Sequence, residues 1–111
     1  MTQDADPLEQ KLAALKTAFA ASVPERIVTI EAAWAEFTAA AAPDEAFEPF
    51  YRAVHNLAGS CATYGFTETA DRARALCDEL YDMRDTKTLA APDRRPRVAA
   101  LVASLRGTVP G

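Results

Sequence analysis

The chain has 111 residues, of which half are hydrophobic and a quarter are charged, and this is the composition of a folded globular protein rather than a disordered one. Its formal net charge of −4 argues against binding to nucleic acid, because affinity for a phosphate backbone depends on clustered Lys and Arg. Since neither a secretion signal nor an apolar run of roughly 18 residues is visible, we expect one cytoplasmic domain over residues 1–111 that does not enter a membrane.

The N-terminal part of the chain predicts two successive helices. The first is expected to begin after an N-cap at Asp6, with Pro7 at its first position, and to run to about Ala21. A Ser-x-x-Glu capping box at residues 22–25 predicts that a second helix begins there and ends near Pro43. The apolar stripe of the first helix comprises Leu8, Leu12, Leu15 and Phe19, and that of the second comprises Ile27, Ile30, Trp34, Phe37 and Ala41.

The third helix has the clearest pattern. It is expected to begin near Asp44 or, after an interruption, near Pro49, and Gly65 supplies a left-handed stop at its C-terminal end. Its apolar positions recur at spacings of three and four residues: Phe47, Phe50, Val54, Leu57, Cys61 and Tyr64.

Two more helices complete the predicted fold. Thr67 is the expected cap of the fourth, whose solvent face includes Glu79, and residues 85–88 form a surface loop. The last helix spans about Pro92 to Arg106, with Gly107 just past its end. Because short connections make neighbouring helices antiparallel, we predict an all-α fold: an antiparallel up-down-up-down four-helix bundle over about residues 22–106, with an additional N-terminal helix across or beside it.

The single histidine, His55, lies one position off the apolar seam of the third helix, on its polar side. A neutral imidazole is a good nucleophile near neutral pH, so this placement suggests chemistry. Gly59, one turn later, leaves the helix surface beside His55 bare, although a closely packed neighbouring helix would explain the glycine equally well. The residues grouped with His55 are Tyr51, Arg52, Ala58, Gly59 and Ala62.

The turn near Gly65 is expected to fold the third and fourth helices into a hairpin. Reflecting His55 through this turn places it near Leu76 and Cys77, so Arg74 and Asp78, on the flanks of that position, are the nearest candidates for polar neighbours of the imidazole. Asp78 would orient the ring tautomer, or it is simply a solvated acidic side chain, and the same alternative stays open for Arg74.

The segment His55-Asn56-Leu57-Ala58-Gly59-Ser60, followed by Gly65-Phe66, resembles the signature of the histidine-containing phosphotransfer (Hpt) domains of two-component phosphorelays, roughly His-x-Leu-Lys-Gly-Ser followed by a second glycine and an apolar residue. The likeness extends over about residues 22–106. One position departs from the pattern: Ala58 stands where the family usually has a lysine, and this puts transfer efficiency or partner choice in question.

The resemblance implies that His55 accepts a phosphoryl group on its far ring nitrogen from a histidine kinase or a receiver-domain aspartate and passes it to a response-regulator receiver. It implies no cofactor of the chain's own, because the partner receiver brings the Mg²⁺. Arg52 is a candidate replacement for the missing lysine, unless it is an ordinary solvated arginine. Ser60 either bonds back to the preceding turn or helps to position the site. Tyr51 is the candidate partner anchor, unless its ring tucks against the second helix.

Other functions fit the sequence less well. One histidine and two cysteines supply no metal site without carboxylates, and Cys61 and Cys77 are expected to be reduced core thiols. The main rival is a non-catalytic helical interaction module, a degenerate Hpt domain that binds and regulates a kinase or receiver without carrying phosphate, and Ala58 keeps this alternative open. We expect a monomeric phosphocarrier rather than a stand-alone enzyme.

Overall fold

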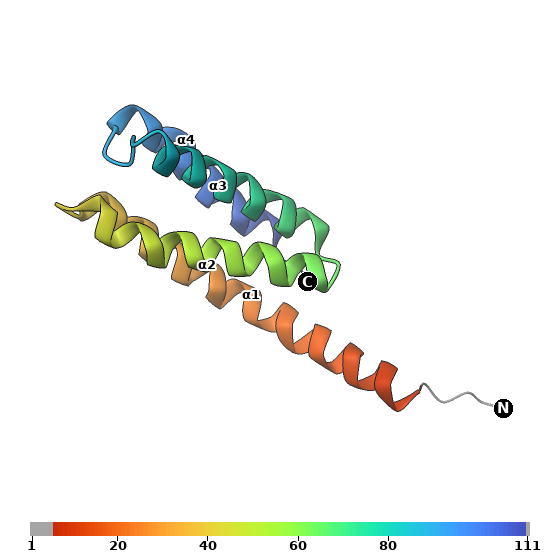
Figure 1. Ribbon diagram of the computed structural model, residues 1–111. Coiled ribbons are helices and arrows are strands. Elements are labelled where there is room, and N and C mark those ends of the chain that lie inside the picture. The colour runs from red at the N-terminus through yellow and green to blue at the C-terminus, as the bar shows by residue number, and fades with distance from the viewer. Residues whose placement is uncertain (1–5, 111) are drawn as a thin grey trace.

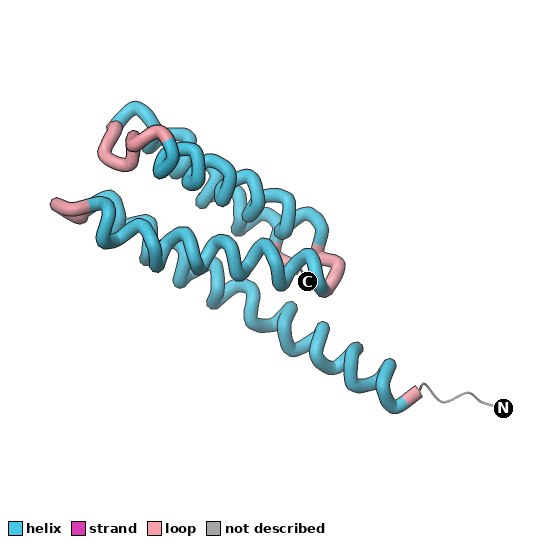
Figure 2. Tube along the Cα trace, viewed as in Figure 1, coloured by secondary structure: helices cyan, strands magenta, loops and turns pink. Residues whose placement is uncertain are grey.

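Four α-helices account for most of residues 6–110, which are the residues described by the structure, a computed structural model. The elements in chain order are α1 (Pro7–Ala39), α2 (Pro43–Thr63), α3 (Thr67–Asp85), a 3-10 turn (Pro92–Arg94), α4 (Arg95–Ser104) and a second 3-10 turn (Leu105–Thr108). The helices pack lengthwise against one another (Figure 1), and no strand occurs within this range (Figure 2). The prediction of an all-α fold is therefore confirmed.

The two N-terminal helices predicted from the sequence form one continuous helix, α1, so an additional N-terminal helix is not seen. The predicted capping box at residues 22–25 is wrong, because the Ser22 hydroxyl donates a hydrogen bond to the Phe19 carbonyl of the same helix (2.6 Å). Pro24 lies inside α1, where it cannot donate the backbone hydrogen bond of a helix interior. Its neighbour Val23 is fully buried, and apolar burial along this stretch offsets the missing bond.

The first turns of α1 project beyond the end of the bundle (Figure 1). Asp6 caps the helix as predicted, since its carboxylate accepts a hydrogen bond from the Leu8 N–H (3.2 Å). With 33 residues α1 is about 50 Å long, whereas the 21 residues of α2 cover only about 32 Å. The α1 helix therefore extends beyond the end of α2. The prediction that this part packs across or beside the bundle is therefore wrong. Three residues of its apolar stripe are widely exposed: Leu8 (61%), Leu12 (53%) and Leu15 (48%).

The α2 helix begins at Pro43 and continues through Pro49, so the interruption left open by the sequence does not occur.

Aromatic side chains join α1 to α2. Phe37 of α1 lies 5.9 Å from Phe50 of α2 between ring centroids, and both are fully buried. Further ring contacts extend this cluster through Trp34 and Phe47.

A tight turn connects α2 to α3 and sets them side by side. Gly65 has a φ of +81°, and the N–H groups of Gly65 and Phe66 donate to the carbonyls of Ala62 (3.2 Å) and Cys61 (2.8 Å). This is the Schellman arrangement, and it confirms the predicted left-handed stop. The predicted cap at Thr67 is wrong, because Phe66 occupies the N-cap position and makes no side-chain bond there.

The last predicted helix is divided into α4 and the two flanking 3-10 turns, so Gly107 lies within the final turn rather than past its end. The buried Thr69 hydroxyl of α3 donates a hydrogen bond to the Thr108 carbonyl (2.7 Å) and fixes this turn against the bundle. Across residues 6–110, no helix combines the length and the apolar character that crossing a membrane requires.

Candidate functional site

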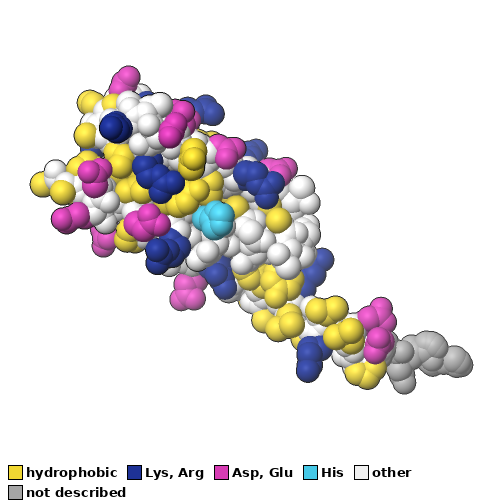
Figure 3. Space-filling view, viewed as in Figure 1, with side chains coloured by type: hydrophobic (Ala, Val, Ile, Leu, Met, Phe, Trp, Pro, Cys, Tyr) yellow, Lys and Arg dark blue, Asp and Glu magenta, His cyan; other side chains and the backbone are white. Residues whose placement is uncertain are grey.

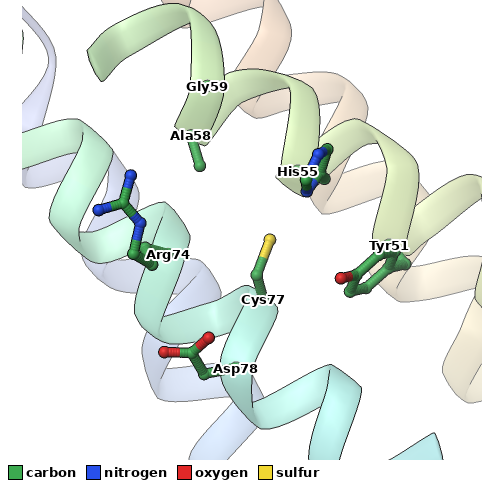
Figure 4. A pocket seen from close by; sticks show the side chains of 7 residues that line it. All are labelled: Tyr51, His55, Ala58, Gly59, Arg74, Cys77 and Asp78. Carbon is green, nitrogen blue, oxygen red and sulfur yellow. The ribbon is translucent and has the colours of Figure 1, made fainter.

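A surface pocket lies between α2 and α3, at the middle of the two helices (Figure 4). Its walls come from residues 51–59 of one helix and 74–78 of the other, which the antiparallel pairing brings to the same level. The residues that line it are Tyr51, His55, Ala58 and Gly59 from α2 and Arg74, Cys77 and Asp78 from α3.

His55 is exposed on the surface of the bundle (Figure 3). The preceding residue, Val54, is fully buried, and this register turns His55 outward. Among the described residues the imidazole takes part in no hydrogen bond or ion pair, and its ring contact is with Tyr51. The ring nitrogens are therefore open to a reagent that arrives from solvent.

Tyr51 forms the wall of the pocket on the N-terminal side of His55. Its ring is partly buried, stacks on Phe47 with 5.5 Å between centroids, and lies 5.3 Å from the guanidinium of Arg84 on α3. The ring therefore faces α3 and is not tucked against the second predicted helix, now part of α1. Burial raises the pKa of the Tyr51 hydroxyl, so this group stays protonated at neutral pH.

Ala58 and Gly59 form the opposite side of the pocket on α2. Ala58 is only 6% exposed, because it lies where α2 packs against α3. Gly59 is exposed, and a Cβ added to it would meet no described atom within 4 Å. The alternative that this glycine allows a close helix contact is therefore wrong, and the surface beside His55 is bare.

The α3 wall contains the residues that reflection through the turn placed opposite His55. The Cys77 side chain points into the space between Ala58 and His55, while the Asp78 carboxylate is turned away from the imidazole (Figure 4). Burial, with a smaller contribution from the Asp78 charge, raises the pKa of Cys77 to about 11. Cys77 is therefore a neutral thiol near pH 7 and a poor nucleophile. Arg74 is the cation that lines this pocket.

Three predicted site residues lie outside the pocket lining. The Arg52 side chain is 69% exposed and pairs with Glu48 at 3.7 Å. Ser60 is partly buried and Ala62 is exposed, and both lie further along α2. Arg84, whose guanidinium covers the Tyr51 ring, is a residue of this site that was not predicted from the sequence. Its position two turns after Cys77 on the same face of α3 is the signal that could have identified it.

The side chains at this site allow nucleophilic chemistry at His55. Within residues 6–110 no group of three or more His, Cys, Asp or Glu side chains lies close enough to bind a metal ion. An exposed imidazole beside bare helix surface can accept an electrophilic group from a partner molecule.

A family model described as "Hpt domain" matches residues 14–108 of the chain. The matched range contains His55 and every residue that lines the pocket, and it leaves the first two turns of α1 outside. No curated protein and no solved structure gives a significant match.

Proposed function

Because this chain belongs to the Hpt domain family, whose members serve phosphorelays by histidine phosphotransfer, we propose that His55 is the residue that carries the phosphoryl group. The observation that carries this proposal is the open imidazole beside Gly59, which has no hydrogen-bonded partner among the described residues and free surface next to it. A partner protein can bring a phosphorylated group to this ring without displacing any side chain.

In the proposed reaction, the lone pair of the far ring nitrogen of His55 attacks the phosphorus of a receiver domain's aspartyl phosphate. The new N–P bond forms as the bond from phosphorus to the aspartate oxygen breaks, and the aspartate leaves as a carboxylate. The reverse sequence passes the group to another receiver, and a histidine kinase would load His55 in a comparable way. Such transfers depend chiefly on positioning and on stabilisation of charge, and the receiver brings the Mg²⁺.

We propose that Arg74 stabilises the negative charge of the phosphoryl group in this chain. It would replace the lysine that the family usually has at position 58, where this chain has Ala58. Arg74 lines the pocket from α3, and a guanidinium is well suited to bind phosphoryl oxygens. Arg52 is less suited to this role, because it lies outside the pocket lining and pairs with Glu48. The Asp78 carboxylate is turned away from the ring (Figure 4), so we assign it no part in orienting the imidazole.

We propose that a receiver or a histidine kinase docks over the His55 face of α2, in the cytoplasm. Around His55 this face exposes Arg52, Gly59 and Ala62, with the partly buried Ser60 beside them. The exposed edge of Tyr51 would give the partner an aromatic contact next to the reacting ring.

The experiment is incubation of the chain with an active histidine kinase and labelled ATP, or with phosphorylated receivers of its source organism. The proposal expects alkali-stable label on the native chain and none on His55→Gln. Asn56→Gln, a change at an exposed neighbour, is the matched control and should retain the label. Tight binding of a kinase or receiver with no label on the native chain would support the rival, a regulatory module that does not carry phosphate.

A further inference from the structure

The projecting part of α1 exposes a row of leucines that the fold leaves uncovered. Leu8, Leu12 and Leu15 are 61%, 53% and 48% exposed, and apolar side chains gather on this part of the molecule in Figure 3. The family match begins at residue 14, so residues 7–13 of α1 lie outside the matched range. None of the three leucines lines the pocket at His55.

The spacing of this row is that of a coiled-coil seam. Leu8, Leu12, Leu15 and Phe19 are separated by four, three and four residues, so they occupy positions d, a, d and a of two heptads. Phe19 is buried by its own bundle, where it stacks on Tyr64 (4.9 Å between centroids) and Phe66 (6.1 Å). The seam therefore begins on the projecting part of α1 and ends at the cluster of Phe19, Tyr64 and Phe66 in the bundle.

We propose that a second copy of this chain covers the seam, with the two α1 segments paired antiparallel. In this register Leu12 packs against Leu15 of the second copy, and Leu8 packs against the edge of the second copy's Phe19 cluster. The two bundles then lie at opposite ends of the paired segment, and each pocket at His55 is left uncovered.

The charges beside the seam select the antiparallel direction. Glu9 and Lys16 both follow a d position, so both are e residues, and an antiparallel pair brings e residues together. Glu9 of each copy then faces Lys16 of the other, which gives two attractive pairs. A parallel pair would instead bring Lys11, a g residue, beside Lys16 of the other copy, which gives two repulsive pairs. Lys16 lies at the edge of the bundle, with its ammonium 5.4 Å from the centroid of the Phe66 ring.

The first experiment measures the mass of the full chain by sedimentation equilibrium. Since two heptads form a small interface, we expect a reversible monomer–dimer equilibrium over roughly 1 to 500 µM. The double substitution Leu12→Glu/Leu15→Glu should be monomeric at all these concentrations. Val28→Glu is the matched control, because Val28 is also on α1 and is 51% exposed but lies outside the seam. It should dimerise like the native chain.

The second experiment tests the direction of pairing by charge reversal. Glu9→Lys and Lys16→Glu should each raise the dissociation constant of the dimer about three- to fivefold, and the combined variant should restore it. A parallel pair would respond to Lys16→Glu with tighter association, and that result would overturn the antiparallel arrangement. A native chain that stays monomeric, or a dimer that tolerates both glutamates in the seam, would overturn the proposal. If the native chain is monomeric and the Leu12→Glu/Leu15→Glu variant loses phosphotransfer while Val28→Glu does not, the exposed leucines would instead be a binding surface for the phosphorelay partner.

Discussion

The rings of His55 and Tyr51 lie nearly parallel on successive turns of α2, with 6.0 Å between their centroids and 22° between their planes. Tyr51 in turn stacks on the buried Phe47 and lies beneath the guanidinium of Arg84. The imidazole is thus supported from one side by contacts that begin in the core. On its other side, toward Gly59, it is free.

Loss of this support should slow phosphotransfer. Tyr51→Ala removes the ring that positions the imidazole, and we expect about a tenfold lower rate of label transfer from a phosphorylated receiver. Tyr51→Phe keeps the ring and should transfer at close to the native rate, with an unchanged circular dichroism spectrum. If the phenylalanine variant is as slow as the alanine variant, the hydroxyl and not the ring carries the effect.

Substitutions at Gly59 should distinguish effects on the stability of the fold from effects on the access of a phosphorylated partner to His55. Since an added Cβ meets no described atom within 4 Å, Gly59→Ala should raise the free energy of unfolding by about 0.5–1 kcal/mol, the usual difference between alanine and glycine in a helix. Gly59→Gln should also stabilise the helix, but its longer side chain leans toward His55 and should slow transfer severalfold. Urea denaturation and the transfer assay measure the two effects. If Gly59→Gln transfers the phosphoryl group at the native rate, the bare surface at Gly59 is not needed for a partner to reach His55.

Two arginines provide a matched pair for the charge at the site. Arg74→Ala should slow transfer about tenfold because it removes the cation that lines the pocket, whereas Arg52→Ala should change the rate less than about twofold. Ala58→Lys in the Arg74→Ala chain should recover part of the rate, since it restores a positive charge beside His55. Equal effects of the two alanine substitutions would show that Arg74 has no special part.

The sequence predicts α2, α3 and the turn between them well, because an apolar seam and a left-handed glycine agree there. It fails at α1, where a local capping box competes with burial of the residues around Pro24, and burial prevails. The seam at Leu8, Leu12 and Leu15 is visible in the sequence, but helical periodicity does not say which surface covers it.

The placement of the pocket residues follows from the hairpin, so reflection through the Gly65 turn brings Arg74 and Asp78 to the level of His55. The orientations of the side chains do not follow. A rotation of α2 by a fraction of a turn decides whether Ala58 is exposed or buried, and the packing of both helices fixes that rotation. The contact of Arg84 with Tyr51 depends on the same packing.

An acidic group on α3 gives a prediction on stability. Glu79 was expected on the solvent face, and this is wrong: its side chain is only 13% exposed and accepts hydrogen bonds from Arg94 (2.8 Å) and Arg97 (2.9 Å). These bonds join α3 to the start of α4. Burial alone would raise the pKa of Glu79, but the bonds from the two guanidinium groups outweigh it and hold the pKa below its usual value.

Because the pKa of Glu79 is lower in the folded state than in the unfolded state, its contribution to stability is fully present above about pH 4.5 and is lost as the pH falls through the folded-state value. Glu79→Gln should lower the free energy of unfolding by about 1–3 kcal/mol at pH 7, since Arg97 then loses its anionic partner and Arg94 keeps only its ion pair with Asp82. The variant should also lose less stability than the native chain between about pH 4.5 and pH 3. Urea titrations at several pH values measure both effects, with the exposed Glu36→Gln as the control. If the two glutamine variants have the same stability and the same acid response, the ion pairs of Glu79 do not stabilise the α3–α4 junction.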